Sequence, residues 1–239
     1  MRLDSYLVQK GLFESRNRAK EAIENNLVLL NGKTATKPSL KVSDNDSIEI
    51  KEHKFYVSRA AKKLEEYLQE YPLALKEAVV LDIGSSTGGF SQILLENGVK
   101  EIDCVDVGSN QLHSTLRTNP KINIFEETDI RDFQTSKEYD LIVSDVSFIS
   151  LNLILDAINN LASPKTVITL LFKPQFEVGK GVKRDSKGVV LDTKAIARAR
   201  ELFLSNTQRL GWTLLDNKKS KITGKEGNQE EFFTFKKGE

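Results

Sequence analysis

The chain has 239 residues, of which 39% are hydrophobic and 29% charged, and its formal net charge is +1. This composition is ordinary for a soluble globular protein, and the length allows one sizeable core plus a smaller module. The segment "MRLDSYLVQKG" lacks the apolar core of a signal peptide, and the longest apolar run, near "VITLLF", is far too short to span a bilayer. A single cysteine excludes an internal disulfide and, with two histidines, leaves little for a zinc site. We therefore expect a cytoplasmic protein without a metal ion.

Residues 1–51 are predicted to form a separate small unit. Leu3 and Leu7 share one face of a helix that Gly11 would end, and Ser15 stands at the cap of a second helix, "RNRAKEAIENN". "LVLLNGK" is predicted as a strand that ends in an Asn-Gly hairpin turn, and "DSIEI" as another short strand. Two helices, a hairpin and a strand give a thin core, so this segment is a module rather than a large domain.

Basic side chains of this unit fall near its start, on its second helix and along its hairpin. They fit contacts to RNA phosphates, which position a protein without specifying sequence, although taken alone they fit a solvated helix face better. "RLDSYLVQKGLFESRNRAKEAI", "LVLLNGK" and "KPSLKVSDNDSIEI", in this order, resemble the S4 domain, a module found in a ribosomal protein and in several rRNA-modifying enzymes. The resemblance implies structured RNA as the partner. The candidate RNA contacts in this unit are Arg2, Arg16, Arg18, Lys20, Lys33, Lys37 and Lys41.

Residues 52–58 are predicted as a polar linker and residues 59–239 as a second domain. After the helix "SRAAKKLEEYLQEY", with Ser58 at its cap, the strands "AVVLDI", "EIDCVDV", "INIFE", "YDLIVSD" and "TVITLLF" alternate with helical segments such as 151–161 and 192–209. This alternation predicts a mostly parallel sheet with helices on both faces. "WTLLD" and "EFFTF" have only a loop between them and should pair antiparallel. We therefore expect an α/β fold with a Rossmann-like sheet of seven strands, the last one antiparallel, beside a small α+β module.

The stretch "VVLDIGSSTGGFSQILLENG" predicts a ligand loop between a buried strand that ends at Asp82 and a helix that starts at Phe90. The loop matches neither the dinucleotide pattern G-x-G-x-x-G nor a P-loop, and Asp82 would repel a pyrophosphate but attract an ammonium or sulfonium group. Asp106, at the tip of the next strand, can accept both ribose hydroxyls of a bound nucleoside, and Asp129 follows the third strand near the expected adenine edge. Alternatively, these acids only cap the loops that follow them.

These features resemble the S-adenosylmethionine methyltransferase fold, and the resemblance implies that cofactor. The residues expected to hold it are Asp82, Gly84, Ser85, Ser86, Thr87, Gly88, Gly89, Phe90, Asp106, Val107, Asp129, Ile130 and Asp145.

Four ionisable residues are expected to converge over this cofactor from strand ends and from one helix. Their order, Lys63, Asp145, Lys173 and Glu230, resembles the K-D-K-E tetrad of ribose 2′-O-methyltransferases related to FtsJ. "YVSRAAKKL", "SDVSFISL", "FKPQFEVGKGV" and "GNQEEFF" resemble the TlyA (haemolysin A-like) rRNA methyltransferases more closely still, so that the resemblance covers essentially the whole chain. A lysine acts as a base only if its pKa is lowered, which partial burial and a second cation achieve. The resemblance implies that role for Lys173, with the two acids holding the ammonium groups.

Two members of this tetrad have a neighbour of the same type. Counting from the preceding Gly-Asn favours Glu230 as the fourth member, counting back from the aromatic run favours Glu231, and we favour Glu230. Lys63 is preferred to Lys62 because it stands directly before a leucine, as in the family.

The resemblance implies methylation of a cytidine ribose in ribosomal RNA of the large subunit, or of both subunits. The compact form of the chain is similar to the family branch expected to act on the large subunit alone. The loop "EVGKGVKRDSKG", residues 177–188, is either an RNA-contacting lid or a disordered surface loop, and "KKSKITGKEGN" is expected beside the RNA. The further RNA contacts expected are Arg59, Lys180, Lys183 and Arg184.

Three other hypotheses belong to different functional classes. An RNA-binding ribosome-assembly factor without catalysis fits the S4-like module, but all four tetrad positions are filled. The family's historical name suggests a membrane-active haemolysin, but the sequence shows no transmembrane run and no strongly amphipathic basic helix that would support this hypothesis. A small-molecule methyltransferase would leave the RNA-type module idle. Cofactor binding without methyl transfer would favour the first, and leakage of liposomes the second.

Overall fold

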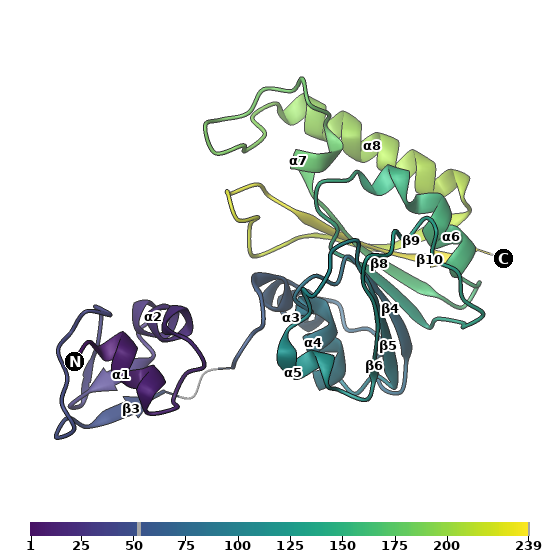
Figure 1. Ribbon diagram of the computed structural model, residues 1–239. Coiled ribbons are helices and arrows are strands. Elements are labelled where there is room, and N and C mark those ends of the chain that lie inside the picture. Colours follow the sequence, from purple (N-terminus) through teal and green to yellow (C-terminus); the bar gives the residue numbers. More distant parts are fainter. Residues whose placement is uncertain (52–53, 239) are drawn as a thin grey trace. The chain divides into compact units, whose positions relative to one another are not determined.

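The computed structural model describes residues 1–51 and 54–238, and the chain divides into two compact units, Met1–Phe55 and Tyr56–Glu239 (Figure 1). The segment predicted as a linker, residues 52–58, spans their junction. Two of its residues, 52 and 53, lie outside the described residues, as does residue 239. Each unit encloses its own hydrophobic core.

The smaller unit packs two helices, α1 (Leu3–Gln9) and α2 (Arg16–Glu24), on a three-stranded antiparallel sheet of order β2–β1–β3. As predicted, an Asn-Gly pair forms the hairpin turn: Asn31 and Gly32 have φ of 50° and 75°, the left-handed conformation that a tight turn requires. The Ser15 hydroxyl caps α2, also as predicted. The strands are β1 (Val28–Leu30), β2 (Lys33–Thr34) and β3 (Ile48–Ile50).

The larger unit contains, within its described residues, a seven-stranded sheet of order β6–β5–β4–β7–β8–β10–β9. Its first five strands in the chain run parallel, and β10 is antiparallel to both of its neighbours, β8 and β9. This confirms the predicted fold class. The strands are β4 (Val79–Ile83), β5 (Glu101–Val105), β6 (Ile122–Phe125), β7 (Leu141–Ser144), β8 (Val167–Phe172), β9 (Trp212–Lys219) and β10 (Glu231–Lys237).

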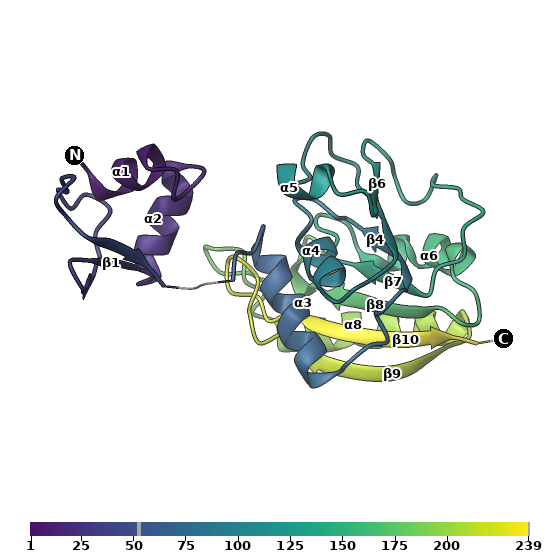
Figure 2. The same cartoon turned by 90° about the horizontal axis from the view of Figure 1, so that it is seen from below.

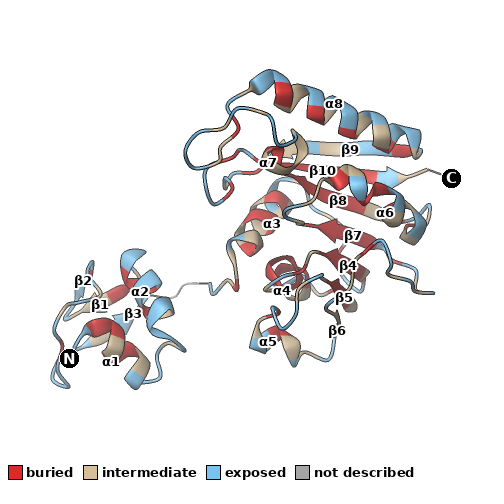
Figure 3. Ribbon diagram, turned by 45° about the horizontal axis from the view of Figure 1, so that its top comes forward, coloured by how far each residue is buried: buried red, intermediate tan, exposed pale blue. Residues whose placement is uncertain are grey.

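Helices cover both faces of this sheet, as the alternating pattern predicts (Figures 1 and 2). One face carries α3 (Arg59–Glu70), α4 (Gly89–Glu96) and α5 (Ser114–Arg117). The other carries the 3₁₀ turn η1 (Leu151–Leu153), α6 (Leu155–Leu161), α7 (Pro174–Glu177) and α8 (Thr193–Arg209). The inner strands are buried, whereas the outer sides of the helices are exposed (Figure 3).

The aromatic run of β10 joins the two helical layers. Neighbouring residues of a strand point to opposite faces, and Phe232 accordingly stacks on Tyr67 of α3 at 4.4 Å. Phe233 and Phe235 pack on the other face against Phe203 of α8, at 5.2 and 5.8 Å between ring centroids. A strand buried on both faces therefore explains why the polar run before it turns abruptly into aromatic residues.

Two local predictions differ from the structure. The helix expected at 151–161 is interrupted, because the Ser150 hydroxyl caps the short turn η1 before α6 begins. Ser58 occupies the N-cap position of α3 as predicted, but within the described residues its hydroxyl makes no capping hydrogen bond; it lies against Gly89, whose Cβ, if present, would be 2.2 Å from it. In the described part of the chain no helix has both the length and the apolar character to cross a bilayer.

Replacing Phe203 with alanine is expected to lower the free energy of unfolding by about 3–5 kcal/mol, because the ring is fully buried and its loss leaves a cavity. The adjacent Leu202 on the same helix is 56% exposed, so Leu202→Ala should change that free energy by less than about 0.5 kcal/mol. Urea unfolding followed by circular dichroism measures both values. Equal losses in the two variants would contradict this account of the core.

Candidate active site

A cavity of about 310 Å³ lies at the carboxyl ends of β4, β5 and β7. Ligands of doubly wound α/β sheets bind at this edge, because the loops between strands and helices meet there. Seven of the thirteen residues expected to hold a cofactor line the cavity: Gly84, Ser86, Asp106, Val107, Asp129, Ile130 and Asp145.

The glycines of the loop after β4 allow close approaches of the backbone. Gly84 has φ of +75°, and a Cβ there would lie 2.9 Å from the Val146 side chain in the loop after β7. Gly88 has φ of +88°, where a side chain would meet Leu116. Both positions combine a left-handed backbone with a crowded neighbour, which only glycine tolerates well. The shape of the cavity therefore depends on the close packing of the loop after β4 against the loop after β7 and against α5.

Asp106 is the expected ribose-binding acid, and it faces the cavity. Its carboxylate accepts hydrogen bonds from the backbone N–H groups of Ser86 and Gly108, both at 2.8 Å. A carboxylate has about four acceptor positions, so these two bonds fix its orientation and leave lone pairs for a ligand. Asp129 also lines the cavity, but Arg131 donates to both of its oxygens and holds the pKa of that carboxyl down at about 2.

Asp82 lies beneath the cavity rather than in its wall. It is 1% exposed, accepts a hydrogen bond from the Ser91 hydroxyl at 2.6 Å, and has a second oxygen, Oδ1, with no partner among the described residues. Burial raises the pKa of Asp82 to about 7, and the negative charges of Asp145 and Asp106 add to the rise. Five other expected cofactor residues also stand outside the wall: Ser85, Thr87, Gly88, Gly89 and Phe90.

The four residues of the expected tetrad form two ion pairs. Lys63 of α3 donates to Glu230, the residue before β10, at 2.5 Å, and both side chains are buried, at 8% and 2% exposed. Lys173, at the end of β8, pairs with Asp145, after β7, at 2.7 Å. The Lys173 ammonium also donates to the Ser147 hydroxyl and to the Asp145 carbonyl, at 2.9 and 3.2 Å.

The two pairs belong to one electrostatic cluster. Burial raises the pKa of Asp145; the charges of Lys173 and Lys63 oppose the rise, and the charge of Glu230 adds to it. Gln175 joins the pairs in space, because it follows Lys173 by two residues and donates its side-chain amide to Glu230 at 3.0 Å. Asp145 itself lines the cavity, so the cluster stands at the cavity wall.

Sequence reasoning missed Gln175 and Ser147. Each follows a tetrad member by two residues, at the point where a strand end turns into a loop or a short helix. That spacing is the signal that could have indicated them. Neither residue is ionisable, so the pattern of charged groups at strand ends does not include them.

The structure separates the two neighbouring glutamates. Glu230 faces Lys63, whereas the Glu231 carboxylate pairs with Arg200 of α8 on the other face of the sheet. Adjacent positions of an extended chain point in opposite directions, which accounts for the difference. The two lysines divide similarly: the Lys62 ammonium lies over the Tyr56 ring, 5.2 Å from its centroid, and only Lys63 reaches the acid.

Of the RNA contacts expected in the larger unit, some side chains are exposed and others are hydrogen-bonded within the protein. Arg59 donates to the Thr223 carbonyl, and Lys180 and Lys183 are exposed. The Arg184 guanidinium donates to four backbone carbonyls and so holds the 177–188 loop together. That loop is therefore folded around an internal arginine.

The basic residues of the smaller unit lie on its surface. Arg2 and Arg16 both pair with Asp4, Arg18 pairs with Glu21, and Lys20 lies 3.7 Å from Glu24. Lys33, Lys37 and Lys41 are exposed. Among residues 1–51 and 54–238, no group of three His, Cys, Asp or Glu side chains could hold a metal ion.

Comparisons with known proteins cover both units. Residues 56–237 match the FtsJ-like methyltransferase family, and residues 1–48 match the S4 domain. The chain is 47% identical over 254 aligned positions to the "23S rRNA (cytidine-2'-O)-methyltransferase TlyA" of Campylobacter jejuni subsp. jejuni, with 98% of this chain and 99% of that protein covered.

Two further relatives extend this similarity. The "16S/23S rRNA (cytidine-2'-O)-methyltransferase TlyA" of Mycobacterium tuberculosis is 38% identical, with 97% of this chain and 88% of that protein covered. A solved structure described as a "Putative hemolysin from Streptococcus thermophilus" superposes with a TM-score of 0.75 at 33% identity, with 100% of this chain and 89% of that chain covered.

Asp82→Asn is expected to stabilise the protein more at pH 8 than at pH 5. Burial raises the pKa of Asp82 from its ordinary value near 4 to about 7, so folding favours the protonated acid and stability is lost as the pH rises through this range. The amide is uncharged throughout and can still accept from Ser91. Urea midpoints at the two pH values measure the difference, with the exposed Asp132→Asn as control. A stabilisation of equal size at both pH values would count against a buried, proton-binding Asp82.

Proposed function

The chain belongs to the FtsJ-like methyltransferase family and carries an S4 domain, and on this basis we propose that it methylates the ribose 2′-oxygen of a cytidine in ribosomal RNA, with S-adenosylmethionine as methyl donor. One observation carries the proposal: the Lys173–Asp145 pair stands at the wall of the cavity where such a donor would bind. The named relatives act on 23S rRNA or on both 16S and 23S rRNA. The 23S rRNA of the large subunit is the substrate we favour, because the relative with that activity is 47% identical over nearly the full length of both chains.

The donor set of the cavity fits S-adenosylmethionine. Asp106, in the cavity wall, has acceptor positions left for ribose hydroxyls. Val107 and Ile130 offer apolar surface for an adenine. When bound, the cofactor supplies an electrophilic methyl group on a sulfonium.

We assign to the tetrad the removal of the proton from the ribose 2′-hydroxyl. Three oxygens hold the Lys173 nitrogen, two from Asp145 and one from Ser147. In the neutral amine one of its positions is a lone pair, which can take up the 2′-hydroxyl proton. Lys63, fixed by Glu230, contributes a positive charge beside that amine, and Gln175 holds Glu230 in place. In this arrangement Lys173 is the general base and the other three tetrad members position it.

The S4-like unit would grip the RNA through its exposed cations, and Arg59, Lys180 and Lys183 would add contacts from the larger unit. An enzyme of this kind acts where ribosomal RNA lies, so we propose a cytoplasmic location. A ribosome-assembly factor that binds RNA without catalysis would use the same cations, but it would have no need of two buried lysine–acid pairs at the cofactor cavity.

Lys173→Ala is expected to reduce methyl transfer to isolated large ribosomal subunits by ~10²- to 10⁴-fold, because the general base is lost. Transfer of a labelled methyl group from S-adenosylmethionine, and resistance of one cytidine to alkaline cleavage, measure the reaction. Lys165→Ala, an exposed lysine before the opposite end of the same strand β8, is the matched control and should retain activity.

Cofactor binding must persist in Lys173→Ala for the assignment to hold, and small subunits should be tested in parallel. If the wild type bound S-adenosylmethionine but methylated neither subunit, the result would contradict the proposed methyltransferase activity and favour the hypothesis of a ribosome-assembly factor. Full activity of Lys173→Ala would assign the proton transfer to another group.

Lys63→Met and Lys62→Met test which lysine belongs to the tetrad. Lys63→Met leaves the Glu230 carboxylate buried without its cation, so we expect both a loss of methyl transfer and a destabilisation of about 3–5 kcal/mol. Lys62→Met removes the contact with the Tyr56 ring and leaves the Lys63–Glu230 pair intact, so it should change neither property much. Methyl-transfer rates and unfolding curves measured on both variants decide the matter; similar behaviour of the two would remove Lys63 from the tetrad.

A further inference from the structure

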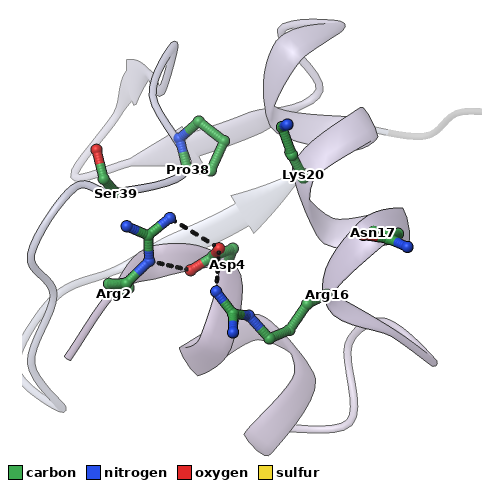
Figure 4. Close-up of a pocket in the computed structure, with 7 residues that line it drawn as sticks. All are labelled: Arg2, Asp4, Arg16, Asn17, Lys20, Pro38 and Ser39. Carbon is green, nitrogen blue, oxygen red and sulfur yellow. Dashed lines mark hydrogen bonds and ion pairs between the residues drawn. The ribbon is translucent and has the colours of Figure 1, made fainter.

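A buried acid of the smaller unit holds two surface arginines together. Asp4, on α1, is 3% exposed, and its carboxylate accepts two hydrogen bonds from the Arg2 guanidinium, both at 3.0 Å (Figure 4). Arg16, the first residue of α2, donates to the same carboxylate at 3.0 Å. The Ser5 backbone N–H and hydroxyl also donate to this carboxylate, at 2.9 and 3.4 Å. The acid thus joins guanidinium groups from two separate segments of the unit.

The two arginines are themselves open to solvent. Their side chains are 50% and 60% exposed, against 5% for the side chain of Asp4. They stand at a concavity of about 590 Å³ that Lys20, Asn17, Pro38 and Ser39 also line. Figure 4 shows the guanidinium groups of Arg2 and Arg16 on either side of the carboxylate. Three cations and one acid leave this concavity with a net positive charge.

The arrangement suits a phosphate better than it suits stability. Ion pairs with half-exposed partners contribute little to folding, so a nearly buried acid is not explained by the strength of its pairs. A guanidinium has five N–H donors in a planar fork, and Asp4 engages only some of them in each arginine. Such forks bind phosphate oxygens, and they bind best when their orientation is fixed beforehand. The two guanidinium groups also hold the pKa of Asp4 well below its usual range, so the carboxylate stays charged.

We infer that Asp4 is a positioning residue that holds Arg2 and Arg16 side by side as a preformed site for a backbone phosphate of the RNA. The inference rests on the proposed function, because it presumes an RNA substrate. The charge of Asp4 alone would not suggest this role, because a carboxylate repels RNA. In this inference Asp4 favours RNA binding indirectly, by fixing the orientation of the two arginines.

Asp4→Asn separates this role from a simple effect of charge. The substitution removes one negative charge, so electrostatics alone predicts tighter binding of RNA. Positioning predicts weaker binding, by about tenfold, because the arginines lose their common acceptor. Asp44→Asn is the matched control: Asp44 is an acid of the same unit, 81% exposed and paired with Lys10, and its loss changes the charge equally without touching the arginines. It should bind RNA as tightly as the wild type or slightly more so.

The measurements are the dissociation constant for isolated large ribosomal subunits over a range of salt concentrations, and kcat and KM for methyl transfer. Asp4→Asn should raise KM about tenfold with kcat nearly unchanged, and should lower the salt dependence of binding by about one to two phosphate contacts. In an Arg2→Ala/Arg16→Ala background it should not weaken binding further, because the arginines that it positions are gone. A general loss of structure would instead lower kcat or persist in that background.

A second variant covers the case in which Asp4→Asn fails to fold. Arg16→Lys keeps the charge and the acid but removes the fork, and it should also weaken binding. The inference is overturned if Asp4→Asn behaves like Asp44→Asn, or if Arg16→Lys binds like the wild type. Either result would leave wild-type methyl transfer, and therefore the proposed function, unaffected. A wild type that neither binds nor methylates subunits would contradict both the proposed function and this inference.

Discussion

Four ionisable side chains gather in a nearly dry place where β7, β8 and β10 end, and the larger unit is arranged around this constraint. Lys63, Glu230 and Lys173 are each 8% exposed or less, and Asp145 is 14% exposed. Taking one such charge out of water costs several kcal/mol unless a partner compensates it. Each lysine therefore meets one acid, and the removal of any member strands a buried charge. The tetrad costs stability that the two hydrophobic layers must offset, and the proton transfer proposed for it gives a reason why such a cluster would be retained.

The antiparallel strand β10 makes this arrangement possible. It pairs with β8 in a register that puts Glu231 opposite Phe172, so the next positions, Glu230 and Lys173, come to the same end of the sheet. The three phenylalanines of β10 secure that register, because a slip of one residue would turn Phe232 away from Tyr67 and Phe233 away from Phe203. It would also exchange Glu230 and Glu231. The aromatic packing of the core and the choice of the glutamate that meets Lys63 are thus fixed by the same pairing.

Strong local signals made much of this predictable from the sequence. Three features could be predicted because each depends on residues that are close in the chain. They are the alternation of strands and helices, the Asn31-Gly32 turn, and the acid and the lysine at strand ends. The choice of Glu230 over Glu231 was only a preference, since it depends on β-sheet register, which local sequence does not encode. Gln175 was missed, and Arg184 was expected to contact RNA, for a related reason: their hydrogen bonds to Glu230 and to loop carbonyls form only when the chain folds. Even where the segments were right, the sequence could not tell that Asp82 lies beneath the cavity and Asp106 in its wall.

The two units use a buried carboxylate in the same way and differ in what becomes of the cation. In the larger unit the acids Asp145 and Glu230 hold lysines that are themselves buried, so the ammonium groups are withdrawn from solvent. In the smaller unit Asp4 is also largely buried, but its arginines are half exposed and present their remaining donors to solvent. The type of cation suits each role, because a lysine can give up its proton and serve as a base, whereas an arginine cannot and keeps its charge for a phosphate. Exposure of the cation, rather than the presence of an ion pair, therefore distinguishes the lysine pairs of the larger unit from the arginine pairs of the smaller one, and it agrees with the roles proposed for the two units.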